Sequence, residues 1–112
     1  MERREIVGLI EDVLIIGTRS AETVAAKCDT GAKRTSIDSA LAERLGVGEH
    51  AKSVKVRSSN GVERRSTHPF TVEVRGTPHN ILASLTDRTP MQFDVILGRD
   101  VLSSYLVDPS SS

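Results

Sequence analysis

The most informative segment of this chain is Ala26-Lys27-Cys28-Asp29-Thr30-Gly31-Ala32, where a strand-forming run ends in an acidic turn. The residues Thr23 to Cys28 predict a β-strand, and Asp29-Thr30-Gly31 predicts a tight loop at its end. In such a loop, backbone N–H groups can donate hydrogen bonds to the carboxylate of Asp29. The tripeptide is also a common turn sequence, expected by chance in roughly 2% of chains of this length. Other parts of the sequence must therefore decide whether Asp29 has a chemical role.

Short apolar runs separated by turn residues predict a β-protein with few helices. Asn60-Gly61 predicts a two-residue hairpin turn, and Gly76-Thr77-Pro78 predicts a second turn. A helix is expected over Ser39 to Leu45, because Asp38 suits the N-cap and Gly46 suits the position after the last turn. A second, short helix is expected over Arg99 to Ser104. The expected strands are Ile6 to Ile10, Val13 to Ile16 (broken from the first by Glu11-Asp12), Thr23 to Cys28, Val54 to Ser58, Val62 to Thr67, Phe70 to Val74, Asn80 to Leu85, Phe93 to Leu97 and Leu106-Val107.

Length and composition limit the possible classes of protein. The 112 residues are enough for a single domain over 1–112, and an apolar content of 38% fits a globular protein. Two Phe, one Tyr and no Trp leave a core of small aliphatic residues, which association would help to stabilise. Fifteen basic residues balance fifteen acidic ones, so charge gives no reason to expect nucleic acid or a membrane surface as partner. The single cysteine and the lack of a signal-type apolar start predict a cytoplasmic protein.

A second motif follows the Asp-Thr-Gly loop at a distance of about seventy residues. It is Phe93-Asp94-Val95-Ile96-Leu97-Gly98-Arg99-Asp100-Val101-Leu102, and the Asn60-Gly61 hairpin lies between the two motifs. This order resembles the retropepsin-like aspartic peptidases, over nearly the whole chain. The resemblance implies a small closed β-barrel with one or two short helices. It also implies an aspartic endopeptidase that hydrolyses a peptide or protein substrate.

The resemblance assigns roles to residues of both motifs. Asp29 becomes the catalytic carboxylate, in an active-site loop with Thr30, Gly31 and Ala32. The Thr30 hydroxyl would link the active-site loops of two subunits, and Gly31 would allow substrate to approach the backbone. Gly98 and Arg99 would support the loop, and Asn60-Gly61 would form the tip of a flap over the substrate. In viral members the arginine pairs with an Asp at the position of Lys33, so its partner here is open among Asp38, Asp94, Asp100 and Asp108.

A single Asp-Thr-Gly has a consequence for assembly. Aspartic peptidases use two carboxylates that share one proton, one acting as base toward water and the other as acid toward the peptide carbonyl. One such aspartate per chain therefore predicts a homodimer with the site on its two-fold axis. The alternative is a non-catalytic peptide-binding or dimerisation module of the same fold, with Asp29 retained as a loop-capping group.

The closest resemblance is to the retropepsin-like branch associated with ribosomal-protein glutamate ligases, whose members are labelled ATP-dependent zinc proteases. The residues that resemble this branch are Ile6-Val7-Gly8, Asp29 to Ser36, Met91 to Leu102 and Leu106-Val107-Asp108-Pro109-Ser110. No cofactor is expected, because the three histidines form no zinc motif and the chain has no phosphate-binding P-loop.

Two further features of the sequence have competing interpretations. Cys28 is expected to be a small core residue, because it points to the opposite strand face from its neighbours. The alternative is a Cys28 nucleophile paired with His50, His68 or His79, which no local signature supports. Six basic residues, Arg64 and Arg65 among them, lie from Lys52 to Arg75, and Lys33 and Arg34 follow the Asp29 loop. They are either solvated surface charges that discourage edge pairing or groups that attract an acidic peptide.

Overall fold

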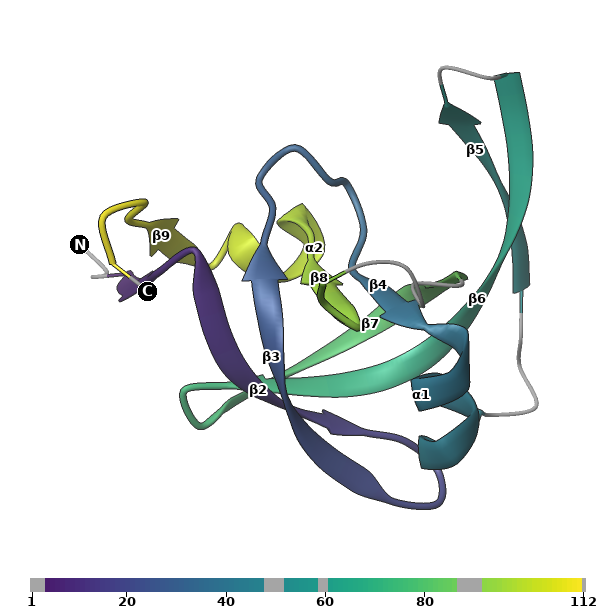
Figure 1. The fold of residues 1–112 in the computed structure, drawn as a ribbon, viewed down its shortest axis with the longest axis horizontal. Helices are drawn as coiled ribbons and strands as arrows, with labels where there is room; N and C mark the ends of the chain where they lie inside the picture. Colours follow the sequence, from purple (N-terminus) through teal and green to yellow (C-terminus); the bar gives the residue numbers. More distant parts are fainter. Residues whose placement is uncertain (1–3, 48–51, 59–60, 87–91, 112) are drawn as a thin grey trace.

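The chain folds into a small closed β-barrel, as a computed structural model shows (Figure 1). The structure describes residues 4–47, 52–58, 61–86 and 92–111. Within these residues, six strands follow one another around the barrel in the order β2-β3-β8-β4-β7-β6, and pairing of β2 with β6 closes it. The six are β2 (Ile10–Ile16), β3 (Ala21–Cys28), β4 (Ser36–Asp38), β6 (Gly61–Val74), β7 (Thr77–Thr86) and β8 (Val95–Leu97). The expectation of a closed barrel with two short helices is confirmed.

Aliphatic side chains fill the barrel, as the scarcity of aromatic residues requires. One layer runs across four strands, because the registers place Ala26 beside Val95, Val95 beside Ile37, and Ile37 beside Leu85. The first three of these side chains are fully buried. Residues that are register partners project from the same face of a sheet, so alternate positions of these strands face away from the core.

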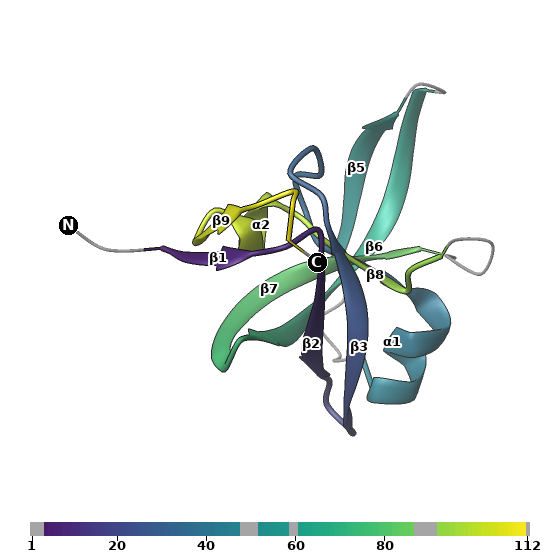
Figure 2. The same cartoon turned by 60° about the vertical axis from the view of Figure 1, so that its left-hand side comes forward.

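Two helices and a terminal sheet complete the described fold. Helix α1 (Ser39–Leu45) begins after Asp38, whose carboxylate accepts hydrogen bonds from the N–H groups of Ala40 and Leu41, and it ends at Gly46 with φ at 91°. Helix α2 (Arg99–Leu102) follows β8 directly. The strands β1 (Glu5–Val7) and β9 (Tyr105–Val107) pair in parallel, side by side at one end of the molecule (Figures 1 and 2). Of the described helices, the longer has seven residues, so neither is long and apolar enough to span a membrane.

The N-terminal strands differ from the expected ones. The expected break at Glu11-Asp12 is wrong, because β2 runs through both residues and the chain breaks at Gly8-Leu9 instead. Glu11 stays in the strand because its carboxylate accepts hydrogen bonds from the Gly8 N–H and from the Arg75 guanidinium, both at 2.9 Å. Glu11 therefore belongs to strand β2, because Arg75 in the turn between β6 and β7 supplies its partner.

The strand β6 also differs, because it joins two expected strands into one of 14 residues. The expected interruption at His68-Pro69 is absent. Pairing with β5 (Lys52–Ser58) ends at Thr67 and pairing with β2 begins at Thr71, so the strand around Pro69 pairs with β7 alone. Proline is tolerated at such a one-sided position, because its missing N–H removes no hydrogen bond on the free edge.

Candidate active site

The loop that follows β3 holds Asp29 in a defined conformation. The Asp29 N–H donates to the Leu97 carbonyl at 3.0 Å, and the Ala32 N–H donates back to the Asp29 carbonyl at 3.1 Å. The Gly31 N–H donates to Asp29 Oδ1 at 2.9 Å. A side chain at Gly31 would bring its Cβ within 3.2 Å of the same oxygen. The backbone thus donates to the carboxylate as the sequence predicts, while Thr30 and Gly31 themselves stay exposed.

Gly98 and Arg99 both contact the Asp29 loop from the end of β8. The Gly98 Cα lies against the backbone of Arg34, and an added Cβ would lie 2.6 Å from the Arg34 carbonyl oxygen. The Arg99 guanidinium donates to the Thr30 carbonyl at 3.0 Å, and the Arg99 N–H donates to the Ala32 carbonyl at 2.8 Å. These two residues therefore lie where the sequence places them, in support of the loop.

The open question about the partner of Arg99 has an unexpected answer. Its described hydrogen bond goes to the backbone, and none of the four candidate carboxylates forms an ion pair with it among the described residues. Asp38 caps α1, and Asp108 accepts from the Ser110 N–H and hydroxyl. These hydrogen bonds from Ser110 lower the pKa of the Asp108 carboxyl. The arginine therefore holds the loop through a backbone carbonyl, and this contact needs no carboxylate at the position of Lys33.

A second carboxylate, Asp100, holds the far end of the loop and was not predicted to do so. Both Asp100 oxygens accept from the Thr35 N–H, at 3.0 and 2.9 Å, and the Thr35 hydroxyl donates to Oδ1 at 2.8 Å. The same hydroxyl accepts from the Gly98 N–H at 3.2 Å. Thr35 is fully buried, so this network ties the end of the loop to the start of α2. The available signal was the acidic residue after Gly98-Arg99 together with a Thr six residues after Asp29.

The hairpin of β5 and β6 projects from the barrel on the side where the Asp29 loop lies (Figures 1 and 2). The two strands pair antiparallel from Lys52 opposite Thr67 to Ser58 opposite Gly61. Gly61 is therefore the first residue of β6, whereas Asn60 lies outside the described residues. Arg64 and Arg65 belong to the same strand, opposite Lys55 and Val54. The arrangement agrees with a hairpin arm that extends above the loop.

Cys28 is buried in the core directly before Asp29, as expected. Burial, together with the negative charge of Glu11, raises the pKa of its thiol to about 11. A thiol with so high a pKa is a poor nucleophile at neutral pH. Asp29 is therefore the chemically competent side chain of this segment.

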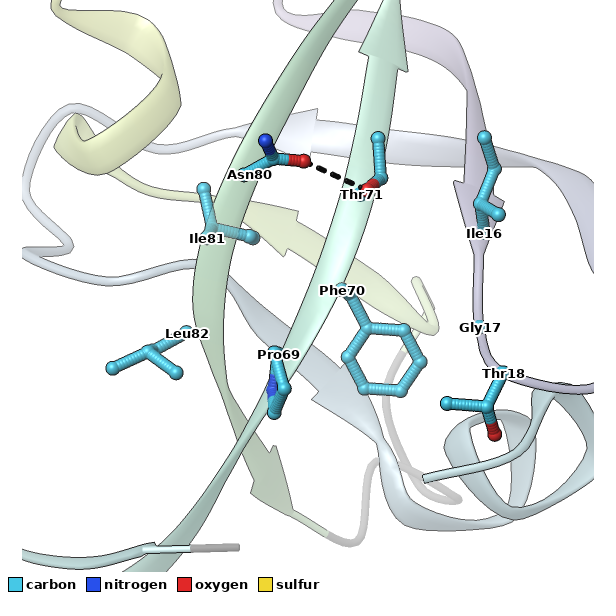
Figure 3. A pocket seen from close by; sticks show the side chains of 9 residues that line it. All are labelled: Ile16, Gly17, Thr18, Pro69, Phe70, Thr71, Asn80, Ile81 and Leu82. Carbon is cyan, nitrogen blue, oxygen red and sulfur yellow. Dashed lines mark hydrogen bonds between the residues drawn. The ribbon is translucent and has the colours of Figure 1, made fainter. Parts of the chain in front are cut away.

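A groove lies at the other end of the β2–β3 hairpin from Asp29, and Figure 3 shows the residues that line it. It has a volume of about 520 Å³ and no titratable side chain. Its lining residues are Ile16, Gly17, Thr18, Pro69, Phe70, Thr71, Asn80, Ile81 and Leu82. The Thr71 hydroxyl donates to the Asn80 side-chain oxygen across one rim at 2.8 Å. With no acid or base in this groove, the Asp29 loop remains the candidate site.

The described residues contain no group of three or more His, Cys, Asp or Glu side chains placed to hold a metal ion.

Comparison with solved structures defines the class of this fold. A Legionella pneumophila protein of unknown function shares it with a TM-score of 0.65 and 20% identity, over 96% of this chain and 95% of that protein. The protease of a simian foamy virus shares it with a TM-score of 0.60 and 18% identity, over 84% of this chain and 91% of the viral protein. A search of curated protein sequences finds no match. The fold is thus that of the small retropepsin-like barrel.

A family model described as "Aspartyl protease" matches residues 13–101, which include the Asp29 loop, the hairpin and the Gly98-Arg99 segment. The chain belongs to this aspartyl protease family. Family and fold together support a hydrolase of the protease type with a peptide substrate.

Proposed function

We propose that this protein is an aspartic endopeptidase in which Asp29 activates water for hydrolysis of a peptide bond. The observation that supports this most is the Gly31 N–H donating to Asp29 Oδ1, in a chain that belongs to an aspartyl protease family. This hydrogen bond fixes the orientation of the carboxylate and leaves its other oxygen free of any hydrogen bond to the described residues. An oriented carboxylate with a free oxygen is what general base catalysis on water requires.

The active form is proposed to be a homodimer, because each chain holds one Asp-Thr-Gly. Two Asp29 carboxylates meeting on a two-fold axis would share a proton, since two like charges so close cannot both be ionised. The ionised carboxylate takes a proton from water as it attacks the peptide carbonyl. The protonated one donates a hydrogen bond to the carbonyl oxygen, and no covalent intermediate forms.

The remaining groups have supporting roles in this proposal. Arg99 and Asp100 hold the two ends of the loop, and the β5–β6 hairpin around Asn60-Gly61 closes over the bound peptide as a flap. A flap excludes water and strengthens the polar contacts beneath it. The active-site loop would comprise Asp29, Thr30, Gly31 and Ala32. Thr30 would contact the loop of the partner subunit.

We further place the chain nearest the retropepsin-like branch associated with ribosomal-protein glutamate ligases, on the Val107-Asp108-Pro109-Ser110 ending and on Lys33 after the loop. Its compartment is proposed to be the cytoplasm, because the single Cys28 is buried as a free thiol. Neither proposal affects the chemistry assigned to Asp29.

The test is cleavage of a diverse peptide pool, read by mass spectrometry, by the wild-type protein and by Asp29→Asn. The amide is nearly isosteric and can still accept from the Gly31 N–H, so the variant should fold and should cleave nothing. Asp108→Asn serves as a matched control, because its carboxylate lies in an exposed C-terminal turn. Peptides that bind without being cut would favour the alternative function, a peptide-binding module. Cleavage by Asp29→Asn at the wild-type rate would exclude Asp29 as the catalyst.

A further inference from the structure

Lys27 and Asp29 project from the same face of the barrel wall. The Asp29 N–H donates to the Leu97 carbonyl at 3.0 Å, so the ladder between β3 and β8 continues through Asp29. Successive strand residues point to opposite faces, and Cys28 between the two points into the core. Two residues of strand span roughly 6.6 Å, so Lys27 is the nearest cation along the strand to the Asp29 carboxylate.

A polar row of side chains begins at Lys27 and crosses the barrel toward the hairpin. The registers place Lys27 beside Ile96, Ile96 beside Ser36, and Ser36 beside Ser84. Ser84 in turn lies beside Thr67, where the pairing of β5 with β6 begins. This row lies on the opposite face from the buried layer Ala26, Val95, Ile37 and Leu85. The row therefore has Lys27 at the end that lies next to Asp29.

Lys27 is the exposed member of this row. Ile96 is half-buried, whereas Ser36, Ser84 and Thr67 are 8%, 4% and 0% exposed, so the protein encloses their side chains. Lys27 is therefore the member of the row that a bound peptide can reach.

The charges on this face favour an anion close to Asp29. Lys27 is exposed and makes no ion pair with any described carboxylate, and Lys33 in the loop is exposed in the same way. Among the described residues, the carboxylates on this face that lie nearest to Lys27 are Asp12, opposite Ala25 in β2, and Asp94, two residues before Ile96. Two others share the face: Asp38, which caps α1, and Glu73, which lies opposite Leu14 further along β2. Asp12 and Asp94 both lie about two residues further along the strands from Asp29 than Lys27 does, so Lys27 is the charge on these strands that lies nearest to Asp29.

We propose that Lys27 makes this site select peptides with a Glu or Asp side chain next to the scissile bond. The inference rests on the proposed function, since it concerns the substrate of that same site. The Lys27 ammonium would pair with the substrate carboxylate. Dimerisation would supply a second Lys27 on the other side of the two-fold axis, so both sides of the scissile bond would prefer acidic residues.

The test compares matched peptides that differ only by Glu or Gln next to the bond cut most often in a random pool. The wild-type protein should cleave the Glu peptide with a kcat/KM about fivefold higher, the upper end of what an exposed ion pair contributes. Lys27→Gln should abolish the preference for the Glu peptide, and Lys27→Glu should reverse it. Arg19→Gln, in the turn between β2 and β3, should preserve the preference. A ratio near one in the wild-type protein, or preference for a Lys peptide through Asp12 and Asp94, would overturn the inference.

A binding measurement separates this inference from the proposed function. Fluorescent peptide pools with one position fixed as Glu or as Gln are titrated against Asp29→Asn and against Asp29→Asn with Lys27→Gln. Tighter binding of the Glu pool, lost with Lys27→Gln and weakened by salt, would support the role of Lys27 even if no peptide is ever cleaved. Equal binding of the two pools, or binding of neither, would overturn it even if the wild-type protein is an active peptidase.

Discussion

Two carboxylates define the loop after β3, and their environments assign them different roles. Asp29 accepts one backbone hydrogen bond and is partly exposed, which leaves it available for chemistry. Asp100 accepts from the N–H and the hydroxyl of buried Thr35, and from the N–H of Val101, so its hydrogen-bonding capacity is used by the fold. Asp100 is therefore a positioning residue, and Asp29 is the candidate catalyst.

Replacing Asp100 by Ala should destabilise the protein by about 1–3 kcal/mol, because the buried Thr35 N–H and hydroxyl lose their acceptor. The measurement is the free energy of unfolding from urea titration. Asp108→Ala, which removes only hydrogen bonds to exposed Ser110, should cost much less. Equal losses for the two variants would mean that the Thr35 network does not stabilise the fold.

The sequence indicated Asp29, Gly98 and Arg99 as candidate site residues, because each belongs to a short motif with a local meaning, and the structure brings the three together at one loop. It did not predict the pairing of Asp100 with Thr35, which are 65 positions apart. The hydrogen bond that Arg99 makes to the Thr30 carbonyl was equally hidden, because sequence patterns indicate side chains as partners and not backbone oxygens. Contacts of this kind depend on how β3 and β8 align with each other, and this alignment cannot be deduced from either strand's sequence alone.

At the scale of whole elements, the strands and helices whose signals are local were predicted well. Helix α1 has its cap residue and its terminal glycine in the sequence, and the β5–β6 pairing follows from Asn60-Gly61. The errors at Glu11-Asp12 and at His68-Pro69 both arose from residues that ordinarily end strands. Tertiary structure keeps both segments in strands. Glu11 has a partner in Arg75 from a distant turn, and Pro69 lies where β6 pairs on one side.

Glu11 provides a pH-dependent test of one such contact. Burial tends to raise the pKa of its carboxyl, but hydrogen bonds from Arg75 and Gly8 and the charge of Arg75 outweigh this and lower it. A lowered pKa means that the ionised form stabilises the fold above the ordinary Glu range, and that this contribution is lost as the pH falls through the folded-state pKa. Glu11→Gln should therefore cost about 0.5–1 kcal/mol at neutral pH, since Arg75 is half-exposed, and less near pH 3. A difference that does not change with pH would contradict this assignment.

At the scale of the whole molecule, the exposed apolar residues lie where a second copy could cover them. Ile6 and Leu106 are register partners in the β1–β9 sheet, and each is 53% exposed. Leu9 and Ile10 continue the exposed apolar surface at 42% and 39%. A barrel with a small aliphatic core gains stability by covering such a surface.

The assembly should therefore be a dimer of about 24 kDa, twice the 12.1 kDa of one chain, in sedimentation at micromolar concentration. Leu106→Lys should shift it toward monomer, because a charge would have to be buried at the contact. Val47→Lys, at another exposed apolar position, should leave the dimer intact. A wild-type protein that stays monomeric at every concentration and still cleaves peptides would contradict a shared pair of aspartates.

The central claim, that one Asp29 from each of two chains forms the catalytic pair, is tested most directly by mixing wild-type protein with Asp29→Asn. The two are unfolded together, refolded at a fixed total concentration, and assayed on a peptide that the wild-type protein cleaves. If both carboxylates are required, activity follows the square of the wild-type fraction, and an equal mixture retains about a quarter of the full activity. Activity that falls in direct proportion to the wild-type fraction, to about half in the equal mixture, would mean that each chain acts alone and would contradict the claim.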